Sequence, residues 1–170
     1  MLDRYQAIDP EKLALTAENI VLDVGCGFAD FANFLDTRYR DVRYTGVDVS
    51  RAMLDEAARL HPDKDIRRLN ILNERPGRFD LVTANGIFYL LGDGAEGLMR
   101  ELIVAMFEAA VEGVAFNSLS AWAVDKEDGE FYADPLDTLA FCRTLTPRVV
   151  LRHDYHPRDF SVYLYKDAAG

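Results

Sequence analysis

The sequence has little cysteine, no clustered positive charge and no long apolar run. Cys26 and Cys142 are the two cysteines in 170 residues, too few for a disulfide framework, and no Cys/His group has zinc-site spacing. No apolar run reaches the roughly 18 residues that a membrane-spanning helix needs, and residues 1–5 lack the features of a secretory signal. We therefore expect a reduced, cytoplasmic protein with no bound metal and no membrane partner.

The charge balance excludes another class of partner. The formal net charge is −10, and the 19 Lys and Arg residues are scattered along the chain. Arg67 and Arg68 form the only adjacent basic pair, which we interpret as the solvent face of a strand. Because neutralising phosphates requires clustered cations, we expect no nucleic-acid partner.

Length and composition fit one globular domain over residues 1–170. The chain is long enough for a sizeable core and leaves little room for a second domain. With 49% hydrophobic and 28% charged residues, it has the balance of a folded protein. Residues 1–19 are expected to form a lead-in with one helix. The sequence leaves open whether the protein is a monomer or a homodimer.

The stretch from residue 21 to residue 31 organises the rest of the chain. It begins as a short apolar run of the β type, reaches Asp23, and passes through Gly25 and Gly27 into residues with helical spacing. A strand, a glycine turn and a helix bring backbone N–H groups up to a ligand. Glycine also lets the ligand approach without a Cβ in the way. Cys26 is expected to be a small buried thiol beside this turn.

Two acids indicate the kind of ligand. A dinucleotide fingerprint has a third glycine, three residues after the second and near the pyrophosphate, and here that position is Asp30. An acid there repels a pyrophosphate, whereas Asp23 suits a ligand with a cationic ammonium and no phosphate. S-adenosylmethionine is such a ligand, and residues 21–31 resemble the first motif of the class I S-adenosylmethionine-dependent methyltransferases. The alternative is an ordinary strand followed by a helix.

The resemblance continues along most of the chain and implies a Rossmann-like methyltransferase fold. We expect an α/β, doubly wound, mainly parallel seven-stranded sheet that ends in a C-terminal antiparallel hairpin. The expected strands are residues 20–24, 42–47, 66–69, 79–84, 114–117, 149–155 and 160–165. The expected helices are residues 29–38, 51–60, 95–112 and 135–144, the third of them ended by Gly113. Residues 73–77 leave no room for a helix between the third and fourth strands.

The resemblance also implies which residues bind the cofactor. Asp48 lies 23 positions after Gly25, close to the distance at which a β-α-β unit places an acid beside an adenosine ribose. The alternative for Asp48 is a strand-end acid that faces water. Ser50 then caps a helix that carries Met53. The predicted cofactor-binding residues are Asp23, Gly25, Cys26, Gly27, Asp48, Val49, Met53, Asn70, Ile71, Ala84 and Asn85.

Three of these residues keep a second interpretation. Asn70 stands where the family commonly has an acid that accepts from the adenine amino group, and its amide oxygen can still accept. Ile71 either flanks the adenine ring or continues the core. Asn85 lies in the turn after the fourth strand, where it either hydrogen-bonds cofactor or acceptor, or stabilises the bend.

The segment from residue 118 to residue 134 is expected to cover the acceptor side. Seventeen residues without a clear strand, in so compact a chain, indicate a lid or a binding loop. Trp122, Phe131 and Tyr132 within it either form walls for an acceptor or pack a short helix onto the sheet.

The candidates for a general base stand at the mouth of the predicted hairpin. They are His153, Tyr155 and His156, and a surface role is the alternative for each. The predicted function is S-adenosylmethionine-dependent methyl transfer, by in-line displacement, to a hydroxyl or amine of a small molecule. The sequence also resembles a subgroup of small bacterial-type methyltransferases, some in polysaccharide or natural-product pathways. The alternative function is a non-catalytic module that binds S-adenosylmethionine or S-adenosylhomocysteine.

Overall fold

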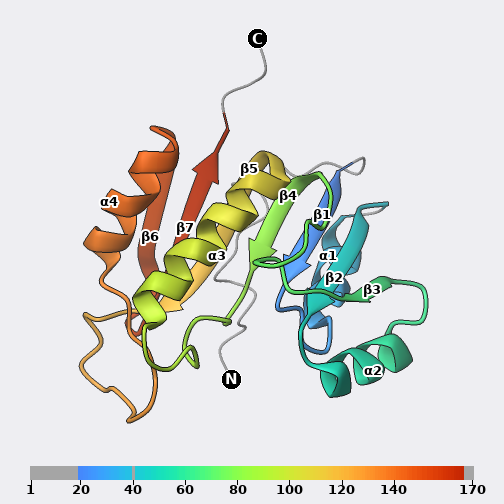
Figure 1. The fold of residues 1–170 in the computed structure, drawn as a ribbon, viewed down its shortest axis with the longest axis horizontal. Coiled ribbons are helices and arrows are strands. Elements are labelled where there is room, and N and C mark those ends of the chain that lie inside the picture. Colours follow the sequence, from blue (N-terminus) through green and yellow to red (C-terminus); the bar gives the residue numbers. More distant parts are fainter. Residues whose placement is uncertain (1–18, 40, 167–170) are drawn as a thin grey trace.

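The computed structural model describes residues 19–39 and 41–166. The lead-in helix expected before residue 19 lies outside the described residues. The described part forms one seven-stranded sheet flanked by helices (Figure 1).

The sheet has the strand order β3-β2-β1-β4-β5-β7-β6. Strands β1 to β5 run parallel to their neighbours in this set, whereas β7 is antiparallel to both β5 and β6. The predicted parallel sheet with a C-terminal hairpin is therefore confirmed. The strands are β1 (Ile20–Val24), β2 (Arg43–Asp48), β3 (Asp65–Arg68), β4 (Phe79–Ala84), β5 (Ala110–Leu119), β6 (Val149–His156) and β7 (Asp159–Tyr165).

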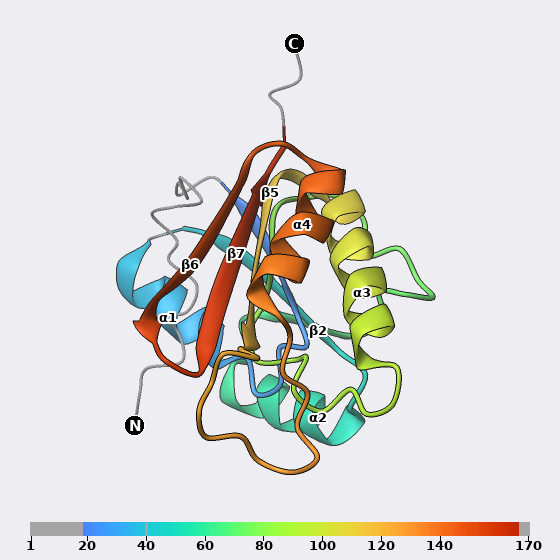
Figure 2. The same ribbon diagram turned by 90° about the vertical axis from the view of Figure 1, so that its left-hand side faces the viewer.

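Four helices cover the two faces of this sheet. They are α1 (Asp30–Arg38), α2 (Arg51–Leu60), α3 (Ala95–Ala109) and α4 (Pro135–Leu145). Side chains of α1 and α2 belong to one buried cluster, and side chains of α3 and α4 belong to the other. Seen from the side, α3 and α4 lie across the sheet from α1 (Figure 2).

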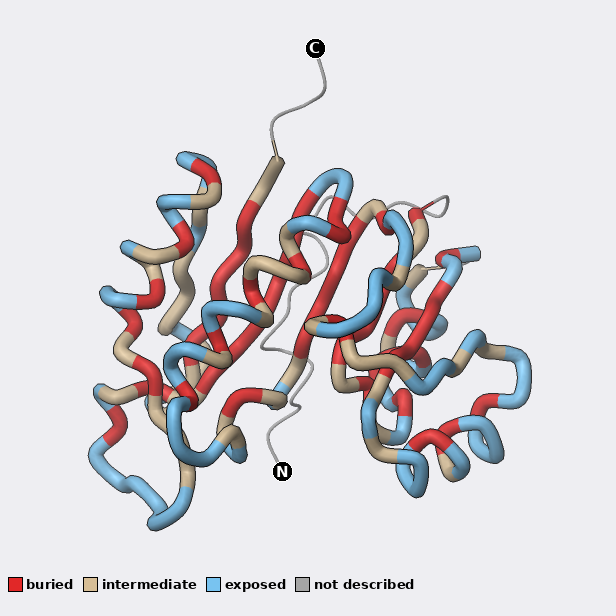
Figure 3. Tube along the Cα trace, in the orientation of Figure 1, coloured by how far each residue is buried: buried red, intermediate tan, exposed pale blue. Residues whose placement is uncertain are grey.

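The alternation of side chains along the central strands explains these two layers. In β1, Val21 packs in the cluster with α1, and Leu22 and Val24 pack in the cluster with α3. Because a strand sends successive side chains to opposite faces, a central parallel strand must be apolar on both. The central strands are accordingly the most continuously buried part of the chain (Figure 3).

Two expectations about the second half of the chain are wrong. The third helix ends at Ala109 rather than at residue 112, and Gly113 lies inside β5, paired with Leu81 on β4 and Tyr165 on β7. Pairing on both sides favours an extended chain here over local helix propensity. Residues 120–134 contain no helix, so the expected short helix is absent. The predicted lack of a helix between β3 and β4 is confirmed.

Two glycines test the packing of the fold. A Cβ added at Gly46 in β2 would lie 2.9 Å from both Cys26 Sγ and Tyr44 OH, whereas one added at Gly97 in α3 meets nothing within 4 Å. We expect Gly46→Ala to lower the free energy of unfolding by about 1–3 kcal/mol through overpacking. The matched Gly97→Ala should raise it by about 0.5–1 kcal/mol. Urea unfolding measures both changes, and equal effects would contradict this packing.

Candidate functional site

The predicted strand, glycine turn and helix meet at the carboxyl edge of the sheet. The backbone N–H groups of Gly25 and Cys26 both donate to Val47 O, at 2.8 and 3.1 Å. Gly25 and Gly27 have φ of +69° and +55°, values that an L side chain rarely adopts. The turn therefore carries the chain from β1 across the end of β2 and into α1.

The carboxylate of Asp48 joins this turn to the start of α2. Asp48 Oδ2 accepts from Gly27 N at 3.0 Å, and Oδ1 accepts from Ser50 N at 2.8 Å. Ser50 Oγ in turn accepts from Met53 N at 3.4 Å as the N-cap of α2, as predicted. A carboxylate offers about four lone-pair sites, so Asp48 retains capacity for further donors. It is a half-buried structural acid rather than a free acid facing water.

Asp23 is the buried acid of the site. Its side chain is 3% exposed, Oδ2 accepts from Tyr44 OH at 2.8 Å, and Thr83 Oγ1 lies 3.5 Å from Oδ1. Burial raises the pKa of Asp23 to about 7, and the negative charge of Asp48 adds to the rise, while the two hydroxyls oppose it. Burial and these two acids also raise the pKa of the Cys26 thiol. Cys26 therefore stays protonated, as a buried thiol beside the turn.

A cavity of about 620 Å³ opens where these elements meet. Its walls come from the chain after β1 and from the chain after β4, the two strands between which the sheet order reverses. Ligands of doubly wound folds bind at this switch point. All the predicted cofactor residues line the cavity except Ala84, which is fully buried in the core cluster with α3.

An apolar rim surrounds the cavity. Phe28, Val49, Met53 and Leu90 line it, with exposed fractions of 45%, 60%, 41% and 68%. Exposed apolar side chains gathered at one opening mark a binding site. Val49 and Met53 are among the predicted cofactor residues, whereas Phe28 and Leu90 are not. Their signal was the position of a large apolar residue directly beside a predicted turn.

Asn70, Ile71 and Asn85, the three residues with two interpretations, all line the cavity. Asn70 Oδ1 accepts from Leu72 N at 3.1 Å, so the amide oxygen stabilises the turn after β3. Ile71 is 8% exposed, packs in the core and also lines the cavity. Asn85 lines the cavity from the chain after β4.

None of the three candidate bases lines the cavity. His153 Nε2 lies 2.8 Å from Ser120 Oγ, and its ring stacks against those of Trp122 and Phe160. His156 Nδ1 accepts from Arg158 N at 3.2 Å. Tyr155 OH donates to Asp159, and burial raises the pKa of this tyrosine above its ordinary value. Each candidate therefore has a contact that holds part of the hairpin in place.

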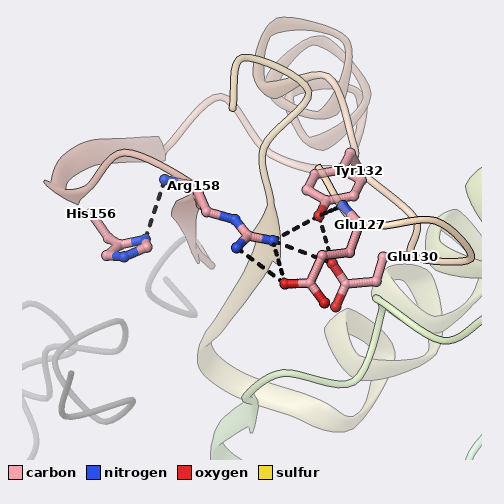
Figure 4. Close-up of polar contacts among 5 residues, drawn as sticks. All are labelled: Glu127, Glu130, Tyr132, His156 and Arg158. Carbon is pink, nitrogen blue, oxygen red and sulfur yellow. Dashed lines mark hydrogen bonds and ion pairs between the residues drawn. The ribbon is translucent and has the colours of Figure 1, made fainter. Parts of the chain in front are cut away.

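Contacts from several parts of the fold hold the segment proposed as a lid, beginning with those of His153 to Ser120 and Trp122. Arg158, in the turn between β6 and β7, donates to Tyr132 OH at 2.8 Å and lies 3.3 to 3.4 Å from carboxylate oxygens of Glu127 and Glu130 (Figure 4). Phe131 N donates to Tyr89 O at 2.9 Å. Phe131 and Tyr132 line a separate cavity of about 190 Å³ beside α3 and α4. These two aromatic residues are therefore walls of that smaller cavity.

No three His, Cys, Asp or Glu side chains among residues 19–39 and 41–166 gather closely enough to hold a metal ion. In the same part of the chain, every helix is too short or too polar to cross a membrane.

Comparison with known proteins identifies the family. A family model described as a methyltransferase domain matches residues 22–107, a span that includes the glycine turn, Asp48 and the chain after β4. The chain belongs to the class I S-adenosylmethionine-dependent methyltransferases. The predicted family, fold and cofactor are therefore confirmed.

Relatives of this methyltransferase differ in how far they match. A putative methyltransferase of Mycobacterium tuberculosis, Rv1506c, is 28% identical over 151 residues, which are 85% of this chain and 91% of the relative. Trans-aconitate 2-methyltransferase of Paracidovorax citrulli is 32% identical over 103 residues, which are 59% of this chain and 39% of that enzyme. The chain thus spans well under half of this second relative.

Solved structures share the methyltransferase fold. Magnesium protoporphyrin IX methyltransferase from Synechocystis, with bound S-adenosylhomocysteine, matches with a TM-score of 0.71 at 11% identity, over 88% of this chain and 74% of that one. A methyltransferase dependent on S-adenosylmethionine from Archaeoglobus fulgidus matches with a TM-score of 0.72 at 12% identity, over 97% and 93%.

The raised pKa of Asp23 makes the stability of the methyltransferase depend on pH. Between its ordinary value of 3.8 and about 7, the folded protein holds a proton on Asp23 that the unfolded chain has lost. The free energy of unfolding therefore falls as pH rises through this range, by about 2 kcal/mol between pH 5 and 7. Asp23→Asn should remove the part of this decrease in the free energy of unfolding that Asp23 causes. Urea unfolding of both proteins at pH 5 and pH 8 measures it, and an identical pH dependence would contradict the assignment.

Proposed function

We propose that the cavity between β1 and β4 binds S-adenosylmethionine and that the chain transfers its methyl group to a small-molecule acceptor. The observation that carries the proposal is the pairing of two acids, Asp23 and Asp48, with an apolar rim around one cavity. Bound S-adenosylmethionine supplies an electrophilic methyl group on a positively charged sulfur. Its ammonium and sulfonium fit acidic walls, and its adenine fits an apolar rim.

The residues of the cavity divide into three roles in this proposal. Asp48 accepts hydrogen bonds from the ribose hydroxyls with the capacity left by its two backbone contacts. Asp23 stabilises the ammonium by its charge, which in turn favours the ionised acid. The apolar side chains of Val49 and Met53 cover the adenine, and Phe28 extends that surface.

Methyl transfer depends mainly on aligning the acceptor atom with the methyl group of the donor. Holding two reactants in an attacking geometry contributes about 7–11 kcal/mol to lowering the barrier. The chain after β4, with Asn85, Ile87 and Tyr89 on the cavity wall, is the part placed to orient an acceptor. A neutral amine attacks without prior loss of a proton, whereas a hydroxyl needs a base. An amine acceptor therefore agrees with the placement of His153 and Tyr155 away from the cavity.

The charge of the cavity favours a neutral acceptor, or a cationic one whose positive charge lies away from the attacking atom. Asp23, Asp30 and Asp48 line it, whereas no Lys, Arg or His of the described part of the chain does. A polyanion such as trans-aconitate is repelled by such walls. The relative named for trans-aconitate matches over 59% of this chain, so its acceptor does not carry over.

Replacing Asp48 tests the cofactor site. We expect Asp48→Ala to weaken binding of S-adenosylhomocysteine by about tenfold or more, the loss of roughly 1.4 kcal/mol or more in charge-assisted hydrogen bonding. Asp80→Ala is the matched control, because Asp80 Oδ2 accepts from Ile20 N at 2.8 Å at the opposite end of the sheet. Asp80→Ala should lower stability and leave affinity unchanged. Calorimetric titration of both folded variants with S-adenosylhomocysteine measures the two affinities. Equal affinities of the two variants would contradict the role of Asp48 in cofactor binding.

The acceptor class is tested by methyl transfer itself. The protein is incubated with S-adenosylmethionine and panels of primary amines, sugars and hydroxylated small molecules, with trans-aconitate as the anionic comparison. S-adenosylhomocysteine formed over time is the readout. We expect turnover in the amine or hydroxyl panel and none with trans-aconitate. Faster turnover of trans-aconitate than of any neutral or cationic acceptor would contradict the proposed class.

A further inference from the structure

A chain of hydrogen bonds joins the C-terminal hairpin to the wall of the main cavity. Gly86 N, just after β4, donates to Asn117 Oδ1 at 2.7 Å. Asn117 Nδ2, on β5, donates to the carboxylate of Asp159 at 3.1 and 3.3 Å. Tyr155 OH, on β6, donates to the same carboxylate. These hydrogen bonds thus link the segment after β4 to strands β5, β6 and β7, with one residue from each.

The carboxylate of Asp159 determines how the Asn117 amide is oriented. Asn117 is 5% exposed, so its amide must find partners within the protein. An ionised carboxylate only accepts hydrogen bonds, so it takes the NH₂ group and leaves the carbonyl oxygen facing Gly86 N. Burial raises the pKa of Asp159, and the donors Tyr155 and Asn117 oppose the rise. Reversing the amide would break its hydrogen bonds to both Gly86 N and the Asp159 carboxylate.

Gly86, at one end of this series of hydrogen bonds, lines the cavity. Gly86 lies between Asn85 and Ile87, and all three line the cavity. Ile87 packs directly against the glycine turn, since a Cβ on Gly25 would lie 2.4 Å from Ile87 Cγ2. A displacement of Gly86 therefore moves the wall that faces the turn after β1.

We propose that Asn117, Asp159 and Tyr155 are positioning residues that hold the wall formed by residues 85–87 against the glycine turn. The inference rests on the proposed assignment of this cavity to the cofactor. Tyr155 acts through Asp159 and Asn117, as a hydrogen-bond donor and not as a general base. The hairpin that closes the sheet thereby sets the affinity of the protein for the methyl donor.

Exchanging the two polar partners tests this positioning. Asn117→Asp places two carboxylates side by side, and we expect it to weaken binding of S-adenosylhomocysteine by about tenfold, equivalent to roughly 1.4 kcal/mol. In the double variant Asn117→Asp with Asp159→Asn, the new carboxylate at position 117 still accepts from Gly86 N. The new amide at position 159 donates its NH₂ group to that carboxylate, and its oxygen still accepts from Tyr155 OH. We expect it to bind within about threefold of the wild type. Rescue by exchange is a result that a general loss of packing does not give.

Ser118→Ala is the matched control, because Ser118 is similarly buried on the same strand and its hydroxyl donates to the neighbouring Leu119 O at 3.2 Å. Its affinity should equal that of the wild type. Thermal unfolding of every variant separates loss of fold from loss of affinity. Should the two charge variants fail to fold, Tyr155→Phe decides, with an expected loss of about threefold in affinity at nearly unchanged stability.

The outcomes separate this inference from the assignment of the cavity. A wild type that does not bind S-adenosylhomocysteine would remove the cofactor site itself. A wild type that binds, together with a folded Asn117→Asp variant of equal affinity, would overturn the positioning role alone. A folded double variant that binds no better than Asn117→Asp would overturn it too.

Discussion

The arrangement at the carboxyl edge depends on one backbone carbonyl. Val47 O accepts from both Gly25 N and Cys26 N, and this pair of bonds turns the chain leaving β1 across the end of β2. The turn needs a left-handed backbone at Gly25, and the contact with Ile87 leaves no space there for a Cβ. Because β1 and β2 are parallel neighbours, with Asp23 opposite Gly46, the acids near their carboxyl ends lie close to each other. The crossing adds a hydrogen bond from Gly27 N to the carboxylate of Asp48, so the turn and the strand pairing together form the acidic wall of the cavity.

Much of the fold and the cofactor half of the site could be predicted, because their signals are local. Apolar runs, the spacing of Gly25 and Gly27, and an acid followed by a capping Ser50 are each visible within a few residues of sequence. The error at Gly113 has the opposite cause. A glycine ends a helix in isolation, but here strands β4 and β7 pair with it on both sides. That pairing joins residues far apart in the chain, which local periodicity does not report.

The acceptor side was less predictable for the same reason. His153 and Tyr155 have the chemistry of a base, yet their partners Ser120 and Asp159 are known only once the hairpin is folded. Two residues of the apolar rim, Val49 and Met53, could be predicted. Phe28 and Leu90 could not, since they belong to no periodic pattern. Their importance follows from exposure, a property of the folded chain. Site chemistry can therefore be proposed from residue types, but roles depend on which atoms the fold brings together.

The most direct test of the proposed cofactor site is a crystal structure of the protein with S-adenosylhomocysteine. We expect electron density for the nucleoside in the cavity between β1 and β4, with the ribose hydroxyls on Asp48 and the adenine beside Val49 and Met53. The amino group of the ligand should lie on the side of Asp23. Density in the smaller cavity beside α3 and α4, or a ribose with no contact to Asp48, would contradict it.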